Sequence, residues 1–344
     1  MSIITPDRAA PQVGRAPTST GRKSSQVYAA LDIGGTKIAG ALIDEEGSVV
    51  RRAELPTPAR ESTSRMAGTV DAVIDELAAH PAWGTVSGLG IASAGPVDTA
   101  AGTVSPVNIP SWRAFPLVDS VRAHPMLFDG IEPVLLGDAV AVAAAEHWRG
   151  AARGVDNALC MVVSTGVGGG FVLNGRLHPG PSGNAGHIGH ISVDLDGPPC
   201  ACGGRGCVEG YASGTAIARH AVRAGWTPPA GAEATAAAVA VAARAGDERA
   251  LAAYDRSAKA LAAAIAGSAT LLEVEVVVIG GGVAQAGDVL FTPLRRHLRA
   301  FAVLGFTRGL EVRPAALARD AGLVGAAAAA RRQAHASGTP TVTG

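Results

Sequence analysis

One short pattern occurs twice in this chain and restricts the folds that it can adopt. An apolar stretch, a glycine turn, a second apolar stretch, a tight turn and a third stretch form residues 27–55 and again 158–178. Segments with apolar residues at helical spacing follow each copy. We therefore expect an α/β fold made of two related lobes, with a glycine turn from each lobe facing a shared cleft.

The two copies set the expected domain limits. Residues 1–26 are rich in Ser, Thr, Pro, Arg and Lys and lack apolar periodicity, which predicts a disordered tail. The N-terminal lobe is expected over 27–138, completed by a C-terminal helix over 321–334. The second lobe is expected over 139–320, followed by a short tail over 335–344.

Four details of this expectation are specific enough to compare with a structure. Residues 98–130 contain no clear period and are expected to be mostly loop. Strands are expected over 131–136 and 274–279, and an alanine-rich helix over 232–246. The glycine-rich stretch 165–170 is expected to be a turn between two strands.

The charge balance and the apolar pattern exclude several classes of function. Basic and acidic residues number 29 each, so the chain lacks the positive charge expected of a nucleic-acid-binding protein. Its longest apolar runs are alanine-rich and interrupted, too weak for a membrane span. The polar first residues do not resemble a signal peptide, so a cytoplasmic location is expected.

Three of the four cysteines, Cys200, Cys202 and Cys207, lie on one glycine-rich stretch. Three thiols cannot all pair as disulfides, whereas grouped thiolates with one nitrogen suit tetrahedral zinc. His190 is the nearer candidate for the nitrogen ligand, and His187 is the alternative. Because four protein ligands leave no open position, the zinc is expected to be structural and to order the loop 187–209.

The first glycine turn has the composition of a phosphate-binding loop. Gly34 and Gly35 allow backbone N–H groups to approach phosphate oxygens, while Thr36 and Lys37 add a hydroxyl and a positive charge. An ordinary hairpin turn has the same glycines. The second turn, at 165–170, favours a nucleotide held between the two, although no helix follows as in Rossmann or Walker loops.

Asp138 follows an apolar strand and begins a predicted helix. A helix N-cap is the simpler explanation for an aspartate at this position. A carboxylate at a strand end between two phosphate loops is also suited to be a general base for phosphoryl transfer. Glu209 and His187 are candidates for binding sugar hydroxyls, and Cys160 is expected to be a core residue.

Taken together, these motifs resemble the ROK family (repressor, open reading frame, kinase) of sugar kinases, within the actin-like ATPase (ribonuclease H-like) superfamily. The resemblance covers residues 27–334. The matching residues are Asp32-x-Gly-Gly-Thr-Lys37, Ser164-Thr-Gly-Val-Gly-Gly-Gly170, Gly189-His190 and Cys200-x-Cys-Gly-x-x-Gly-Cys207-x-Glu209. It implies a duplicated two-lobe fold with a zinc-binding loop, and an ATP-dependent sugar kinase that uses Mg²⁺ and a structural Zn²⁺. Family members are commonly homodimers.

The resemblance also implies roles for individual residues. Asp138 matches the catalytic base, and the metal ligands are His190, Cys200, Cys202 and Cys207. The residues implied in ATP binding are Asp32, Gly34, Gly35, Thr36, Lys37, Thr165, Gly166, Gly168, Gly169, Gly281 and Gly282. Those implied in sugar binding are Gly95, Asn108, His187, His190 and Glu209.

Within the family, the stretch 185–190 is most similar to bacterial N-acetylmannosamine kinases, because many glucokinases have glutamate in place of His187. We expect the imidazole of His187 to donate a hydrogen bond to the 2-acetamido carbonyl, which a carboxylate cannot do. The expected reaction is therefore 6-phosphorylation of N-acetylmannosamine. One departure is that Gly137 stands where the family usually has asparagine.

Three other functions are compatible with some of these residues. Glucokinase is the first alternative. A catalytically impaired sugar-binding protein is the second, since Gly137 removes a usual sugar contact. The third is a sugar-sensing transcription regulator of the same family. It would need a winged-helix module before Val27, for which the 26 preceding residues are expected to be too few and too polar.

Overall fold

The computed structural model describes residues 26–317 and 319–336, and contains two five-stranded sheets. The first consists of β1 (Val27–Ile33), β2 (Lys37–Asp44), β3 (Val49–Pro56), β4 (Val86–Ser93) and β7 (Val134–Gly137). Its strand order is β3-β2-β1-β4-β7. The first three strands are antiparallel neighbours, while β4 pairs parallel with both β1 and β7.

The second sheet repeats this plan. It consists of β8 (Ala158–Val163), β9 (Val167–Leu173), β10 (Arg176–His178), β11 (Val276–Gly280) and β12 (Glu311–Pro314), in the order β10-β9-β8-β11-β12. The antiparallel and parallel pairings match those of the first sheet strand for strand. The duplication that the sequence predicts is therefore confirmed.

Both sheets are buried on two faces, because alternate residues of a strand point to opposite sides. Along β1, Ala29, Leu31 and Ile33 belong to one core cluster, and Tyr28 and Ala30 belong to another. The helix α1 (Thr63–Ala78) covers the first of these faces, with Met66, Val70, Val73, Ile74 and Leu77 buried. The 3-10 helix η1 (Pro81–Thr85) leads from α1 into β4.

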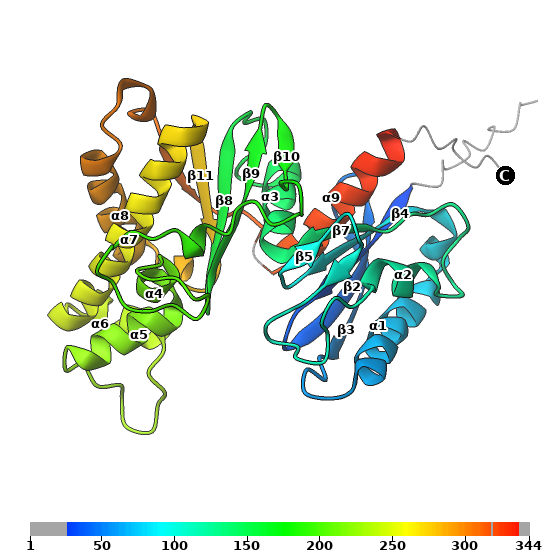
Figure 1. Cartoon of the computed structure of the whole chain (residues 1–344), viewed down its shortest axis with the longest axis horizontal. Helices are drawn as coiled ribbons and strands as arrows, with labels where there is room; N and C mark the ends of the chain where they lie inside the picture. Colours follow the sequence, from blue (N-terminus) through cyan, green and yellow to red (C-terminus); the bar gives the residue numbers. More distant parts are fainter. Residues whose placement is uncertain (1–25, 318, 337–344) are drawn as a thin grey trace, which may run out of the picture.

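Each half of the molecule consists of one five-stranded sheet and the helices that pack on it. Two central helices are exchanged between the halves, because each follows a strand of one sheet and packs on the other. The helix α3 (Asp138–Arg149) follows β7 but packs on β8 and β9, and α9 (Ala321–Ala336) follows β12 but packs on β1 and β4. The two helices lie against each other between the sheets (Figure 1). Small residues permit this: a Cβ added at Gly325 would lie 1.7 Å from the Ala141 carbonyl oxygen.

Helices also cover the outer face of the second sheet. These are α4 (Glu209–Ala212), α5 (Gly214–Arg223), α6 (Ala236–Arg244), α7 (Glu248–Leu272) and α8 (Asp288–Phe301). The long α7 is fully buried along one side and forms the centre of this core. The 3-10 helices η2 (Ile188–His190), η3 (Ala284–Ala286) and η4 (Gly305–Thr307) lie in the connections. None of the helices in the described part of the chain is long and apolar enough to span a membrane.

The expected loop over 98–130 contains more structure than the sequence predicts. The short strands β5 (Val97–Asp98) and β6 (Thr103–Val104) pair, and α2 (Leu117–Arg122) follows them. Elements this short show no measurable apolar period, and burial of Leu117, Val118 and Val121 stabilises the helix instead.

Some element ends also differ from expectation. The helix expected from residue 232 begins at Ala236, because the Thr235 hydroxyl accepts the Ala238 N–H at 3.2 Å and caps it. The strands expected from 131 and 274 begin two or three residues later, at Val134 and Val276. The helix α9 continues to Ala336, into the expected tail. The rest of that tail, and residues 1–25, lie outside the described residues.

Candidate active site

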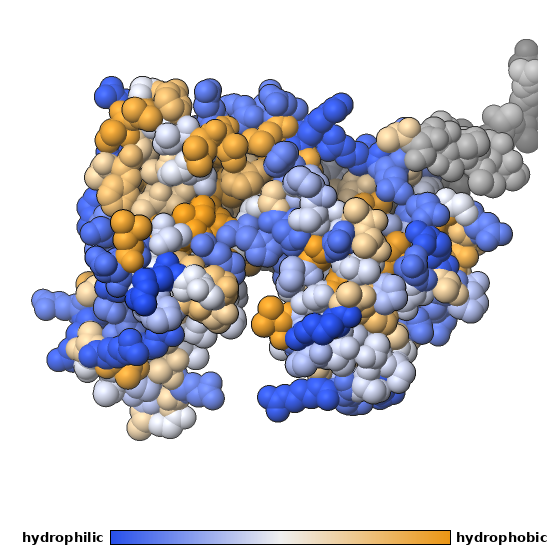
Figure 2. Space-filling model, viewed as in Figure 1, coloured by the Kyte–Doolittle hydropathy of each residue, from blue (hydrophilic) through white to orange (hydrophobic). Residues whose placement is uncertain are grey.

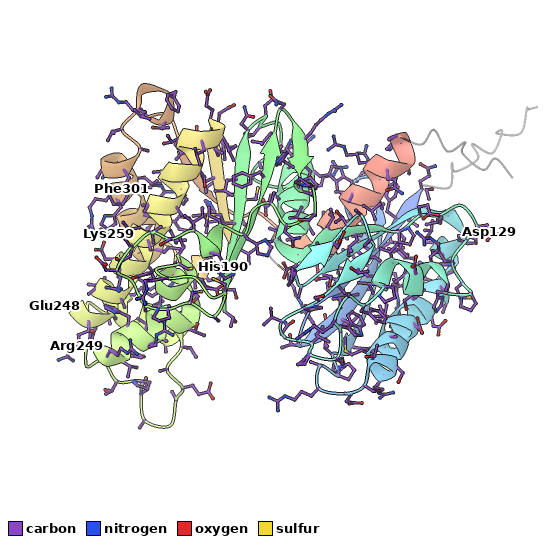
Figure 3. The ribbon with its side chains drawn as sticks, viewed as in Figure 1. Asp129, His190, Glu248, Arg249, Lys259 and Phe301 are labelled. Carbon is purple, nitrogen blue, oxygen red and sulfur yellow. The ribbon has the colours of Figure 1, made fainter. Side chains whose placement is uncertain are left out.

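A cavity of about 580 Å³ lies between the two halves, and both sheets contribute residues to it. Figure 2 shows that the molecular surface is notched between the halves, and in Figure 3 the side chain of His190 lies on the side of the second half that faces the first. Most of the candidate site residues line this cavity: Asp32, Gly95, Asn108, Asp138, Thr165, Gly166, Gly168, Gly169, His187, His190, Glu209 and Gly281.

Asp138 is the first residue of α3, directly after β7. Its Oδ1 accepts the N–H of the adjacent Ala139 at 2.7 Å, but the N-cap position is Gly137 and no side chain caps the helix. The carboxylate is therefore not an N-cap, and it faces the cavity. The protein around the cavity raises the pKa of Asp138 by burial, while the Ala139 N–H and the nearby His187 act in the opposite direction.

Asp32 lies near Asp138, at the end of β1. Burial, and then the negative charge of Asp138, raise the pKa of Asp32 to about 6. The first turn of α9 approaches it so closely that a Cβ at Gly322 would lie 2.4 Å from Asp32 Oδ2. Two carboxylates of raised pKa in one cavity are typical of a functional site.

The two glycine stretches have different conformations. Residues 34–36 form the expected turn, closed by the Gly34 N–H to the Lys37 carbonyl oxygen at 3.0 Å. The expected turn over 165–170 is wrong in its second part, because Gly168 and Gly169 lie within β9. Their lack of a side chain allows close packing: a Cβ at Gly168 would lie 3.0 Å from the Ala139 Cβ, and one at Gly169 3.0 Å from the Cys160 carbonyl oxygen.

His187 lies close to Gly95, which belongs to the first half. A Cβ added at Gly95 would lie 3.9 Å from His187 Nε2. Its Nδ1 is 2.8 Å from the Asn184 carbonyl oxygen. Since a carbonyl oxygen only accepts, Nδ1 carries the proton in the neutral ring, and Nε2 is then an acceptor. The expectation that a neutral His187 donates to the sugar is therefore not supported by this geometry.

Asn184 holds this wall against the first half. Its Oδ1 accepts the Val97 N–H at 3.1 Å, and its Nδ2 donates to the Val97 carbonyl oxygen at 2.6 Å. The Thr99 N–H also donates to the Ser182 carbonyl oxygen at 3.2 Å. These bonds join the segment before His187 to β5 and to the residue that follows it.

Glu209 begins α4, and its Oε2 accepts the Val167 N–H at 2.8 Å. This bond holds the carboxylate beside Gly166, where a Cβ would approach it to 2.7 Å. Glu209 thereby connects the cysteine-rich segment to the start of β9 inside the cavity.

The four predicted metal ligands, His190, Cys200, Cys202 and Cys207, lie together, with their donor atoms within 4.8 Å of one another. Cys202 Sγ is 3.7 Å from Cys207 Sγ, and Cys200 Sγ is 3.8 Å from His190 Nδ1. Ligands of one tetrahedral zinc are about 3.5–3.8 Å apart, given Zn–S and Zn–N bonds of about 2.3 and 2.1 Å. The donor set therefore fits zinc, and His187, bound to Asn184, is not part of it. Cys160 is fully buried, as expected of a core residue.

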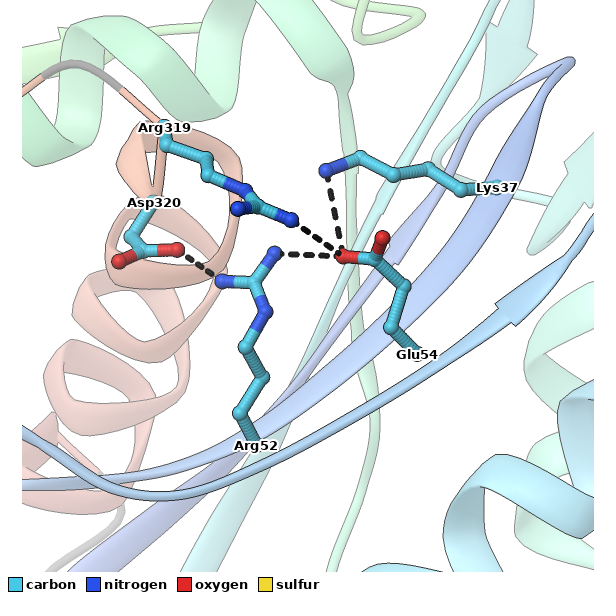
Figure 4. A network of polar contacts seen from close by, with 5 residues as sticks. All are labelled: Lys37, Arg52, Glu54, Arg319 and Asp320. Atoms are coloured by element: carbon cyan, nitrogen blue, oxygen red, sulfur yellow. Dashed lines mark hydrogen bonds and ion pairs between the residues drawn. The ribbon is translucent and has the colours of Figure 1, made fainter.

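Lys37 does not line the cavity but belongs to a group of charged residues at its edge (Figure 4). Glu54 Oε2 accepts from Lys37 at 3.4 Å, from Arg52 at 2.8 Å and from Arg319 at 3.5 Å, and Arg52 also pairs with Asp320. The group links β2 and β3 to the start of α9. Gly34, Gly35, Thr36 and Gly282 are likewise absent from the cavity wall, although Asn108 packs directly on Gly35.

The sequence did not identify Asn184, Arg319 and Gly322 as lining residues. Asn184 directly precedes the stretch 185–190 and follows Gly183, so its place beside that stretch was an available signal. Arg319 and Gly322 reach the cavity only because α9 packs on the first sheet, and no local pattern indicates this.

Comparison with known proteins gives a consistent result. The sequence profile of the ROK family matches residues 28–333. A glucokinase of Halalkalibacterium halodurans is 37% identical, over 88% of this chain and 94% of that protein. An N-acetylmannosamine kinase of Yersinia pseudotuberculosis is 38% identical, over 88% and 97%. The solved structure of a ROK family glucokinase from Streptomyces griseus, in complex with glucose and AMPPNP, has a TM-score of 0.75 and 34% identity, over 89% of this chain and 99% of that one.

Two sheets of the same topology around a shared cavity are characteristic of the actin-like ATPase fold. The profile match and these relatives extend over nearly all of the described chain. The chain belongs to the ROK family and is an ATP-dependent sugar kinase.

Proposed function

We propose that this protein transfers the γ-phosphoryl group of ATP to the 6-hydroxyl of N-acetylmannosamine, with Asp138 as the general base. The observation that carries the proposal is the Asp138 carboxylate, which faces the cavity and forms no ion pair with any of the described residues. A carboxylate without a cationic partner, held at a helix start between two halves, is available to accept a proton.

The proposed step needs little covalent chemistry from the protein. The sugar oxygen attacks the γ-phosphorus, the bond from this phosphorus to the β–γ bridging oxygen breaks, and Asp138 accepts the hydroxyl proton. Catalysis then depends on positioning and on stabilising the charge that develops on the phosphoryl oxygens.

On the nucleotide side, the residues that support the proposal are Asp32, Thr165, Gly166 and Gly281, which line the same cavity. Gly281 has φ +90°, and a Cβ added to it would lie 2.4 Å from the Val163 carbonyl oxygen. Only glycine therefore fits there. Mg²⁺ prefers oxygen ligands, and Asp32 is the carboxylate suited to hold it together with the phosphates.

Two findings support N-acetylmannosamine as the acceptor. The relative from Yersinia that bears this name is 38% identical over nearly its whole length. In addition, the amide N–H of an acetamido group is a donor, and the acceptor Nε2 of His187 suits a donor.

Glucose is the second candidate, because its 2-hydroxyl also supplies a donor to Nε2. Relatives named glucokinase are 34–37% identical over most of this chain. The tautomer of His187 therefore does not separate the two sugars, and a direct comparison is needed.

The deciding experiment is a panel of sugars assayed with ATP and Mg²⁺ and compared by kcat/KM. We expect N-acetylmannosamine to rank first, with 6-phosphorylated product identified by NMR. Glucose in first place would replace the proposed substrate, and binding of a sugar without turnover would indicate an impaired enzyme.

Gly137→Asn adds a test of that impaired alternative. A Cβ at Gly137 would lie 3.7 Å from the Gly183 carbonyl oxygen and 3.8 Å from Val140 Cγ2, which is ordinary contact, and φ is −65°. Asparagine therefore fits. If the wild type is inactive and this variant phosphorylates a sugar, the missing amide explains the defect.

A further inference from the structure

We propose that Glu146 is a positioning residue that fixes the two halves relative to each other and so aligns Asp138 with the nucleotide side of the cavity. The inference concerns the hinge of the molecule and, in its catalytic consequence, rests on the proposed function. Glu146 touches neither the cavity nor any residue assigned to substrate.

Glu146 lies in the last turn of α3 and is completely buried. Its two carboxylate oxygens accept three backbone N–H groups, from Ala151 at 2.7 Å, Ala316 at 3.2 Å and Leu317 at 2.8 Å. One donor follows α3, and the other two come from the connection between β12 and α9, about 170 positions later in the chain.

No cation pairs with Glu146 among the described residues, so these N–H groups alone compensate its charge. An ionised carboxylate in a protein interior is costly unless it is fully hydrogen-bonded. A neutral residue would fill the same space without that cost. The carboxylate is therefore explained by what it holds, namely two separate stretches of backbone.

These stretches are where the chain passes between the halves. It passes once at 137–138, from β7 into α3, and once at 315–320, from β12 to α9. The first connection carries Asp138. The second contributes Ala315 and Leu317 to the cavity wall, and leads to Gly322 beside Asp32. Glu146 therefore links the end of α3, the helix that follows the first connection, to the second connection.

Gly150 provides independent support. A Cβ at this position would lie 2.0 Å from Glu146 Oε2 and 2.6 Å from its Cδ, although its φ of −112° suits any residue. The Glu146 Cα would also lie 2.8 Å away, so glycine is required here by the close approach of both the carboxylate and the α3 backbone, and not by its own φ.

The test uses Glu146→Gln in the full-length protein. The amide keeps one acceptor oxygen but directs an NH₂ group at backbone donors, which loosens the connection. We expect faster hydrogen exchange at the amides of Ala316 and Leu317, and a larger radius of gyration by small-angle X-ray scattering without ligands. We expect kcat to fall about ten- to a hundredfold from misalignment, while the dissociation constants of AMPPNP and N-acetylmannosamine change less than about threefold.

Gly150→Ala displaces the Glu146 carboxylate, and presses on the Glu146 Cα, without changing the chemistry of that side chain, and should have the same effects. Val172→Ala is the matched control, because Val172 is fully buried in β9, packs in the cluster that contains Ala143 of α3, and lies outside the cavity. It should lower the melting temperature and leave the radius of gyration and kcat near those of the wild type.

A lower melting temperature with unchanged scattering and kcat in both Glu146→Gln and Gly150→Ala would overturn the proposal. Failure of both variants to fold, while Val172→Ala folds, would also overturn it. Either result would assign Glu146 to stability alone. If the wild type phosphorylates no sugar, the proposed function fails. The exchange and scattering measurements, which need no turnover, then still decide the role of Glu146.

Discussion

Among single residues, Asp138 carries the chemistry of the proposed reaction. Positioned acid–base catalysis is worth about 10²–10⁴-fold, so Asp138→Asn should reduce kcat by that factor and leave sugar binding intact. Only the ionised carboxylate accepts a proton. Activity of the wild type should therefore rise with pH through the pKa of Asp138, which burial raises above the ordinary value of an aspartate, and then level off.

Rates of product formation between pH 4 and 9, for the wild type and the variant, check this prediction. The variant should lack the acidic limb of the profile. Near-normal kcat in Asp138→Asn, or an unchanged acidic limb, would show that another group accepts the proton.

His187 gives a second prediction at this scale. Because its Nδ1 proton is engaged by the Asn184 carbonyl oxygen, the neutral ring offers the sugar an acceptor, as glutamate does. Because an acceptor is kept, we expect His187→Glu to change the ratio of kcat/KM for N-acetylmannosamine over glucose by less than about threefold. Loss of a neutral hydrogen bond, worth about 0.5–1.5 kcal/mol, would change it by up to about tenfold.

The ratio is measured with both sugars at saturating ATP and neutral pH. His187→Ala, which removes the acceptor, is the control and should weaken the use of both sugars. A shift of about tenfold or more toward glucose in His187→Glu would mean that the imidazole donates to the acetamido carbonyl after all.

Among the structural elements, the segment between η2 and α4 is the one that we expect to depend on a bound zinc. It contains few apolar side chains, and its cysteines and His190 converge at one point. Cys202→Ser should lower zinc content from about one per chain and loosen the segment that carries Glu209, because structural zinc contributes directly to folding.

Metal analysis and limited proteolysis check this prediction, with Cys160→Ala as the control. Cys160 is buried in β8 and lies outside the cluster, so its replacement should leave the zinc content unchanged. Full zinc occupancy in Cys202→Ser would contradict the assignment of the four ligands.

For the whole molecule, the exchange of α3 and α9 makes the first half depend on the last helix. Leu323 is 1% exposed and packs in the cluster that includes Tyr28 and Ala30 of β1. Leu323→Ala should lower the free energy of unfolding by about 2–5 kcal/mol. Arg332→Ala, on the exposed side of the same helix, should change it by less than about 0.5 kcal/mol.

Denaturant unfolding followed by tryptophan fluorescence gives both values, because Trp83 and Trp112 lie in the first half. Equal stability of Leu323→Ala and the wild type would show that α9 does not hold the first sheet.

Several features could be predicted from local sequence alone. The duplicated strand pattern, the cysteine spacing and the position of Asp138 at a strand end are all encoded within stretches of fewer than about 30 residues, where periodicity and turn chemistry act. The structure bears out the duplication and brings the four metal ligands together.

Tertiary contacts decided the rest. Gly168 and Gly169 serve close packing in β9 and not a turn, since α3 and the Cys160 backbone approach them. The tautomer of His187 depends on its contact with the Asn184 carbonyl oxygen, which the local sequence pattern does not predict. Glu146 reads as an ordinary helical residue until its partners at Ala316 and Leu317, far away in the chain, are known. Periodicity reports which face of an element is buried, whereas the partner that covers that face depends on how distant segments pack.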